Sequence, residues 1–188
     1  MNSDQDVVIR SGEYAFRPLC KDDLQMVLNW RNSPRVHAKM LTDHKITWEE
    51  HVNWFRRIQS EPIKRHFIFT YNDKPVGYVA YNAFDSEKHT CEPGVYIADP
   101  KSCPVDAGAV MAALLAEYGY TKLGIERMNF DILASNKRVV KLNQLYGCVF
   151  DRDKDYYVEK DGKRQLVLCG SSTKEMWLQQ KSAQQDEI

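Results

Sequence analysis

The chain has 188 residues, of which 43% are apolar, and this length and composition are typical of a single globular domain with short tails. Its 26 basic and 26 acidic residues give a formal net charge of zero, which argues against a general attraction to nucleic acid or to an anionic membrane. We therefore expect neither nucleic acid nor membrane as a partner.

The sequence also limits the compartment. No apolar run is long enough to span a bilayer, and the first twenty residues contain no stretch typical of a signal peptide. The five cysteines are widely spaced and form no C-x-x-C pair, which favours reduced thiols over disulfides or a zinc site. We expect a cytoplasmic protein.

The N-terminal half alternates between strand and helix signals. Thr47 is followed three residues later by Glu50, which has the form of a capping box at the start of a helix. Residues 72–75, Asn-Asp-Lys-Pro, separate two apolar runs and predict a hairpin. The expected elements are a polar leader at 1–12, a strand at 14–19, a helix at 21–32, a loop at 33–45, a helix at 47–58 and strands at 67–69, 76–79 and 89–97.

The C-terminal half continues the alternation. Asp161-Gly162 lies between two short apolar runs and predicts a second hairpin. The expected elements are a helix at 106–115, a strand at 128–133, a helix at 136–143, strands at 156–158 and 165–168, and a polar tail, partly helical, at 171–188. This order predicts an α/β fold in one domain, at 13–170, between the leader and the tail.

One turn in this order has the composition of a phosphate-binding site. The strand that ends at Ile97 is followed by a turn that enters a helix through Ala107, Gly108 and Ala109. Small side chains there let a ligand approach the backbone N–H groups at the start of the helix. The pattern predicts a pyrophosphate near this turn.

Four consecutive segments, 94–97, 106–115, 128–133 and 136–143, carry a family resemblance. Together with the rest of 14–170 they make the chain similar to the GCN5-related N-acetyltransferases (GNAT). The resemblance implies the GNAT fold: a central mixed, twisted sheet of about six to seven strands, with helices on both faces and a splayed parallel pair of strands that binds acetyl-CoA. It also implies acetyl-CoA as cosubstrate and direct acetyl transfer to an amine.

Two motifs of the family differ in this chain. In the turn, Cys103 stands where the family usually has Arg, and Asp106 stands where it has the first Gly. In the later helix, Asn143 stands where the family usually has a Tyr, and Gly147-Cys148 replaces Gly-Phe. An amide is too weak an acid to protonate a thiolate, although Asn143 could hydrogen-bond the sulfur or orient a water.

The resemblance assigns cofactor-binding and catalytic residues. The cofactor set is Val95, Tyr96, Ile97, Asp106, Ala107, Gly108, Ala109, Asn136 and Asn143.

Glu92 lies where related enzymes place a carboxylate that removes the amine proton, and His51 is the rival base because histidine titrates near neutral pH. Asn143 completes the catalytic set, and Tyr81, Tyr96, Tyr146, water or the substrate stay open as sources of the thiolate's proton.

A second resemblance concerns the acceptor. Trp30-Arg31-Asn32 and the residues that follow are similar to the subgroup that acetylates the 4-amino group of UDP-linked amino-deoxy sugars in pseudaminic acid biosynthesis. A guanidinium can pair with a diphosphate while a neighbouring ring stacks on a base or sugar. The expected acceptor-binding residues are Trp30, Arg31, Asn32, Met40, His51 and Tyr81.

Two other functions stay open: a peptide or ribosomal-protein N-acetyltransferase, and a non-catalytic acetyl-CoA-binding protein. A homodimer is also left open. His37, His44 and His51 recur every seven residues, but Pro34 and the expected loop prevent one continuous helix, so no metal site is expected.

Overall fold

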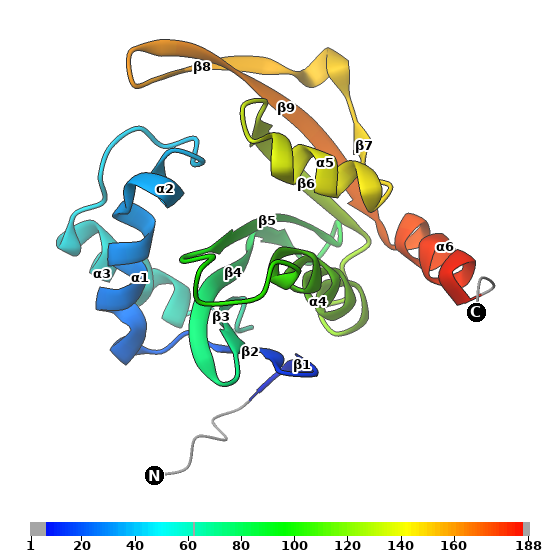
Figure 1. The fold of residues 1–188 in the computed structure, drawn as a ribbon, viewed down its shortest axis with the longest axis horizontal. Coiled ribbons are helices and arrows are strands. Elements are labelled where there is room, and N and C mark those ends of the chain that lie inside the picture. Colours follow the sequence, from blue (N-terminus) through cyan, green and yellow to red (C-terminus); the bar gives the residue numbers. More distant parts are fainter. Residues whose placement is uncertain (1–6, 62, 186–188) are drawn as a thin grey trace. The chain divides into compact units, whose positions relative to one another are not determined.

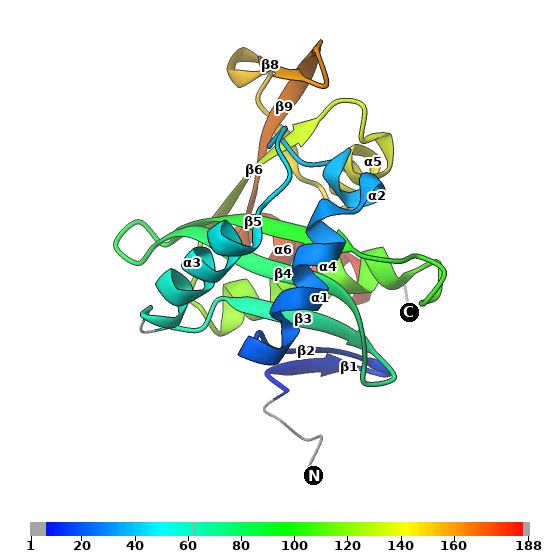
Figure 2. The ribbon, with the colours of Figure 1, turned by 90° about the vertical axis from the view of Figure 1, so that its left-hand side faces the viewer.

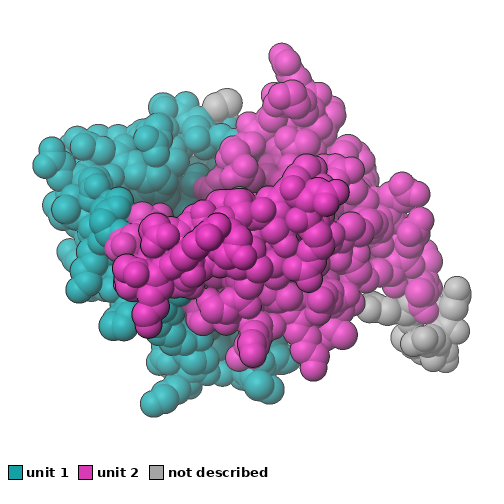
Figure 3. All heavy atoms as spheres, turned by 90° about the horizontal axis from the view of Figure 1, so that it is seen from above, with its two compact units in different colours: residues 1–38, 44–81, 94–115 teal, residues 39–43, 82–93, 116–188 magenta. Residues whose placement is uncertain are grey.

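The computed structural model describes residues 7–61 and 63–185, so the expected leader at 1–12 and tail at 171–188 lie partly outside the described residues. The chain divides into two compact units (Figure 3). The first consists of Met1–Ala38, His44–Tyr81 and Gly94–Leu115, and the second of Lys39–Asp43, Asn82–Pro93 and Ala116–Ile188. The long strands β4 and β5 and the helix α4 each contribute residues to both units.

The strands of the first unit follow one another in the sheet in chain order, and the first four pair antiparallel (Figure 1). Asn72 and Asp73 connect β3 to β4 with φ of 48° and 59°, the left-handed backbone of a tight hairpin turn. The strands are β1 (Ile9–Ser11), β2 (Tyr14–Pro18), β3 (His66–Tyr71), β4 (Lys74–Asp85) and β5 (Thr90–Ile97).

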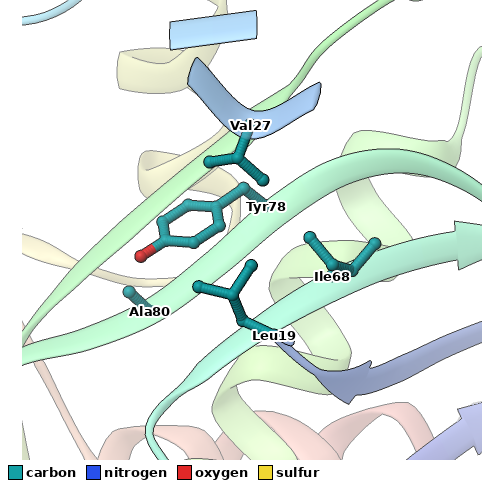
Figure 4. Packing of buried hydrophobic residues seen from close by; sticks show 5 residues of the cluster. All are labelled: Leu19, Val27, Ile68, Tyr78 and Ala80. Atoms are coloured by element: carbon teal, nitrogen blue, oxygen red, sulfur yellow. The ribbon is translucent and has the colours of Figure 1, made fainter. Parts of the chain in front are cut away.

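Helices cover both faces of the strands in the first unit (Figures 1 and 2). Ile68, Tyr78 and Ala80 face α1 and α3, and they form a buried cluster with Leu19 and Val27 (Figure 4). Residues of the opposite parity point the other way, as Tyr81 does, whose hydroxyl donates to the Leu115 carbonyl in the middle of α4. The helical elements of this unit are η1 (Lys21–Asp23), α1 (Leu24–Asn32), α2 (Pro34–His37), α3 (Trp48–Gln59) and the first turns of α4 (Ala107–Thr121).

The second unit contains the parallel pair. β5 pairs in parallel with β6 at Thr90–Arg127 and Cys91–Met128, and β6 pairs antiparallel with β9 along its whole length. β7 and β8 both pair antiparallel with β9. The remaining elements are β6 (Arg127–Leu133), α5 (Lys137–Leu145), β7 (Val149–Phe150), η2 (Arg152–Lys154), β8 (Tyr156–Lys160), β9 (Lys163–Thr173) and α6 (Lys174–Gln185).

The mixed α/β architecture expected from the sequence is confirmed, with two local differences. The described residues form nine strands instead of six to seven, because the short β1 and β7 also pair. The expected loop after Asn32 contains the one-turn helix α2, which begins at Pro34 with the Ser33 side chain as its N-cap. The capping box is present: the Thr47 hydroxyl accepts from the Glu50 N–H, and the Glu50 carboxylate accepts from the Thr47 N–H.

Candidate active site

The end of β5 presents backbone groups on two sides. The N–H of Ala98 donates to the carbonyl of Val76 at 2.8 Å, so Ala98 and, by alternation, Tyr96 are directed toward β4. Val95 and Ile97 therefore direct their N–H groups away from β4. These two amides are the ones that a thioester or pantetheine chain could use, whereas the Tyr96 N–H belongs to the sheet.

A close approach of two strands fixes this strand end. A Cβ on Gly77 would lie 2.6 Å from the carbonyl oxygen of Tyr96, closer than such atoms come in proteins. Only glycine therefore lets β4 pass β5 at this point. On the other side, the guanidinium of Arg35 donates to the carbonyls of Ile97 and Ala98, at 2.7 and 3.1 Å.

The turn before α4 is tied to the strands of the first unit. The Tyr14 hydroxyl donates to the Asp106 carboxylate at 2.9 Å. Burial, then this hydrogen bond, raises the pKa of Tyr14 well above its usual range. The Asp106 carbonyl accepts from the N–H groups of Ala109 and Val110, so part of the backbone assigned to the pyrophosphate already has local partners.

Gly108 and Ala107 lie differently in this turn. A Cβ on Gly108 would meet no atom within 4 Å, so the space over this residue is open, whereas Ala107 is buried. The absence of a side chain at Gly108 thus leaves room beside the first turn of α4 for a ligand group.

Glu92 is exposed on one face of the strands in the second unit. Its neighbours in the parallel pairing, Cys91 and Met128, are both buried, so Glu92 points to the opposite face, as does Asp131 on β6. The Tyr156 hydroxyl donates to Asp131 at 2.8 Å. Burial, this hydrogen bond and nearby negative charges, Glu92 among them, raise the pKa of Tyr156 to about 12. The candidate base therefore lies in an acidic region that contains a protonated phenol.

Asn143 is engaged inside the second unit. Its Nδ2 donates to the carbonyl of Val139 at 3.0 Å, and its Oδ1 accepts from the Cys148 thiol at 3.4 Å. Burial raises the pKa of Cys148, so this thiol stays protonated at neutral pH. Asn136 lies at the N-terminal end of α5, where its carbonyl accepts from the N–H groups of two following residues while its side chain makes no capping bond.

The three residues of the Trp30-Arg31-Asn32 segment make different contacts. Trp30 packs against the buried cluster of Figure 4. Asn32 holds the chain before α3, because its Nδ2 donates to the Ile46 carbonyl at 2.7 Å and its Oδ1 accepts from the Ile46 N–H at 2.9 Å. Arg31 has a buried Nη1 without a hydrogen-bond partner, and burial lowers its pKa while Tyr96 raises it.

Two further candidates are buried in the first unit. His51 is 5% exposed, its ring stacks on Trp54 with a centroid distance of 4.9 Å, and its Nε2 is buried without a partner. Burial lowers the pKa of His51, so it is neutral at pH 7 but, in this structure, shielded from a substrate. Tyr81 is 0% exposed and donates to the carbonyl of Leu115 at 2.8 Å, so here it is a core residue on the face opposite Tyr78.

The two units hold different parts of the expected site. The first contains Trp30, Arg31, Asn32, His51, Tyr81, Val95, Tyr96, Ile97 and residues 106–109, and the second contains Met40, Glu92, Asn136 and Asn143.

Residues near these positions that the sequence did not single out are Tyr156 and Asp131, and the hydrogen bond from Cys148 to Asn143 was not expected either. Their hydrogen bonds join positions brought together only by strand pairing or by the turn after α5, and no local pattern indicates them.

Comparison with known proteins identifies the family. Residues 14–149 match the acetyltransferase (GNAT) domain. Two relatives, both named acetyltransferase PseH and from two strains of Campylobacter jejuni, are 26% and 24% identical, and each match covers 76% of this chain and 87% of the relative.

A solved structure of spermidine N-acetyltransferase from Vibrio cholerae in complex with CoA and spermine shares the fold, with a TM-score of 0.79. It is 17% identical, and the match covers 89% of this chain and 99% of that one.

Among the described residues, no helix has both the length and the apolar character needed to cross a membrane. The family match extends over most of the chain and includes β5, the turn at Asp106 and α5. The protein therefore belongs to the GNAT acetyltransferase family, and is an N-acetyltransferase that uses acetyl-CoA as its cosubstrate.

Proposed function

We propose that this enzyme acetylates the 4-amino group of a UDP-linked amino-deoxy sugar, by direct transfer from acetyl-CoA in a ternary complex. The observation that carries the proposal is Arg31. Among the residues that the structure describes, no carboxylate pairs with its guanidinium, and its buried Nη1 has no acceptor. Arg31 is half-buried, and a buried guanidinium N–H group without an acceptor is costly, so a diphosphate would supply the missing charge and acceptors.

The surroundings of Arg31 suit a nucleotide sugar. Tyr96 lies close enough to affect the pKa of Arg31, and it stacks on Tyr78 with ring centroids 5.4 Å apart and an interplanar angle of 25°. Aromatic rings beside a guanidinium give a surface on which a base or sugar can stack. The resemblance of residues 30–32 to the sugar N-acetyltransferases of pseudaminic acid biosynthesis supports the same acceptor, as do the relatives named PseH.

The chemical steps are assigned as follows. Glu92 removes the proton from the acceptor amine, directly or through a water, because it is the exposed carboxylate on the strand that leads to Val95. The amides of Val95 and Ile97 bind the thioester and pantetheine, and the open turn at Gly108 takes the pyrophosphate. Asn143 hydrogen-bonds the leaving sulfur without protonating it. We place the enzyme in the cytoplasm, consistent with its free cysteines.

Steady-state kinetics with an Arg31→Ala variant test this proposal. A lost charge-assisted contact is worth roughly 1.5–3 kcal/mol, which predicts a ten- to hundredfold rise in KM for the UDP-amino sugar. The KM for acetyl-CoA should change little, because the lost contact is to the diphosphate. Arg56→Ala is the matched control, since Arg56 is exposed on α3 and its guanidinium donates to the neighbouring Asn53.

The same assay separates the rival acceptors. Wild-type enzyme is given a UDP-4-amino sugar, the free 4-amino sugar, spermidine and a peptide amine, with release of CoA thiol as the readout. Turnover of spermidine or the peptide without turnover of the UDP sugar would overturn the proposal, as would equal KM increases for the UDP sugar and the free sugar in Arg31→Ala. Binding of acetyl-CoA without turnover of any acceptor would favour a binding protein.

A further inference from the structure

A side chain from α2 holds the end of β5. The Nη1 atom of Arg35 donates to the carbonyl of Ile97 at 2.7 Å and to the carbonyl of Ala98 at 3.1 Å. These hydrogen bonds join positions 62 and 63 residues apart, and all three residues belong to the first unit. The contact therefore ties the segment that follows α1 to the strand end at which we place the thioester.

The peptide group between Ile97 and Ala98 is held on both sides. Its carbonyl accepts from Arg35, and its N–H donates to the carbonyl of Val76 at 2.8 Å. Because a peptide group is planar, it cannot rotate without losing one of these two bonds. The N–H and the carbonyl of Ile97 lie on the same edge of β5, so a fixed carbonyl also restricts the direction of the Ile97 N–H. This N–H is one of the two amides assigned to the thioester and pantetheine.

The backbone that carries Arg35 is itself fixed. The helix α2 begins at Pro34, and the Ser33 hydroxyl accepts from the N–H of Val36 at 3.4 Å. Val36 is 3% exposed and anchors the single turn in the first unit. The guanidinium of Arg35 thus reaches the strand end from a rigid base, although its own side chain is exposed.

The carboxylate beside this contact is used by its own turn. Asp99 accepts from the N–H of Lys101 and from the hydroxyl of Ser102, both at 2.9 Å. These hydrogen bonds, with a smaller contribution from Arg35, lower the pKa of Asp99. The two hydrogen bonds of Arg35 go instead to main-chain carbonyls. What the guanidinium provides here is a fixed backbone direction at the end of β5.

We propose that Arg35 is a positioning residue for acetyl-CoA, because it fixes the peptide group after Ile97 and with it the Ile97 N–H. The inference rests on the proposed function in one respect, namely that the amides at the end of β5 bind the pantetheine. Arg35 does not touch the cosubstrate: it acts through the Ile97 carbonyl. Loss of its guanidinium weakens the binding of acetyl-CoA and leaves that of the acceptor unchanged.

Calorimetry of acetyl-CoA binding, which needs no acceptor, is the first test. Arg35→Met removes the donor and should raise Kd for acetyl-CoA about fivefold. Arg35→Lys should stay within about twofold of wild type, because both hydrogen bonds come from one nitrogen, which an ammonium can replace. Arg56→Met is the matched control, since Arg56 is an exposed arginine of the same unit and should leave Kd unchanged. Hydrogen exchange at the Ala98 amide should become about fivefold faster in Arg35→Met only.

A second donor separates positioning from direct contact. S-acetylpantetheine has the thioester and pantetheine of acetyl-CoA but no pyrophosphate or nucleotide. If Arg35 acts through the Ile97 peptide group, Arg35→Met raises KM for both donors by the same factor, with KM for the acceptor within about twofold of wild type. A rise for acetyl-CoA alone would show that the guanidinium contacts a phosphate, and would overturn the inference. An equal rise in the KM values of donor and acceptor would overturn it as well.

The outcomes also distinguish this inference from the proposed function. Acetyl-CoA should slow hydrogen exchange at the Ile97 amide in wild type; if it does not, the placement of the cosubstrate fails and the inference fails with it. If the amide is protected and Arg35→Met binds acetyl-CoA as wild type does, only the inference fails. Turnover of spermidine in place of the UDP sugar would overturn the proposed acceptor and leave the calorimetric test unaffected. Should Arg35→Met fail to fold, Arg35→Gln, whose amide is too short to reach both carbonyls, is measured against the same criteria.

Discussion

Acidification should destabilise this protein between pH 6.5 and 4, and we expect His66 to cause most of the loss. The His66 ring is 9% exposed, and its Nδ1 lies 2.7 Å from the Tyr78 hydroxyl. Burial, partly offset by Glu61, lowers its pKa from 6.5 to about 4. Between these two values the unfolded chain binds a proton that the folded protein does not, so the free energy of unfolding falls as the pH falls.

The size of the effect follows from the same two pKa values. They differ by about 2.5, and at about 1.4 kcal/mol for each pH unit the full loss is roughly 3 kcal/mol, complete below pH 4. His51 acts in the same direction, because burial lowers its pKa as well. Burial raises the pKa of Asp23, but Arg17 and the hydrogen bonds from Cys20 together lower it by more, so Asp23 acts in a separate window below its ordinary value of 3.8.

Urea unfolding at several pH values between 8 and 4 measures this loss in wild type and in His66→Gln, which can still hydrogen-bond Tyr78 but does not titrate. The variant should lose about 3 kcal/mol less than wild type on going from pH 8 to 4, whatever its stability at pH 8. His44→Gln is the control, because His44 is exposed and pairs with Glu50 on the surface. An identical pH dependence in wild type and His66→Gln would refute the reasoning.

Three further substitutions test the strand end, the turn and the base. Gly77→Ala should lower the free energy of unfolding by roughly 1–3 kcal/mol in a urea titration, because the new Cβ would lie 2.6 Å from the Tyr96 carbonyl and backbone must move; stability within 0.5 kcal/mol of wild type would show that β4 tolerates the methyl group. Gly108→Val should abolish acetyl-CoA binding in calorimetry while the fold is retained, since its Cβ meets no atom within 4 Å; unchanged affinity would move the pyrophosphate elsewhere. Glu92→Gln should lower kcat about a hundredfold at neutral pH with acetyl-CoA affinity unchanged; full activity there, with activity lost in His51→Gln, would exchange the two roles.

The sequence predicts the elements well where a local rule determines the backbone. The turns at Asn72-Asp73 and Asp161-Gly162 have left-handed backbone in the structure, as hairpins of this length require. Strands β1 and β7 have three and two residues, too few for a pattern, and their pairing depends on longer neighbours.

The candidate site is harder to predict because its contacts join distant positions. The hydrogen bonds between Asn32 and Ile46, and between Tyr156 and Asp131, join residues 14 and 25 positions apart. The position of Tyr81 could have been predicted from the sequence. Strand alternation directs Tyr81 and Tyr78 to opposite faces of β4, and Tyr78 faces α1 and α3.

Lys160 is fully buried and Arg31 is half-buried with a buried Nη1, and the protein provides different partners for the two cations. Lys160 and Arg31 both lose hydration on folding. The net charge of zero gives no indication of either residue's environment. The protein itself supplies partners for Lys160, at Thr42 and Asp43, so that charge is already used within the fold. For Arg31 it supplies no anion among the described residues, and Nη1 remains without an acceptor. Because a buried N–H group of a guanidinium is costly without an acceptor, we propose that the substrate supplies the missing partner of Arg31, and an anionic acceptor fits that requirement better than a polyamine.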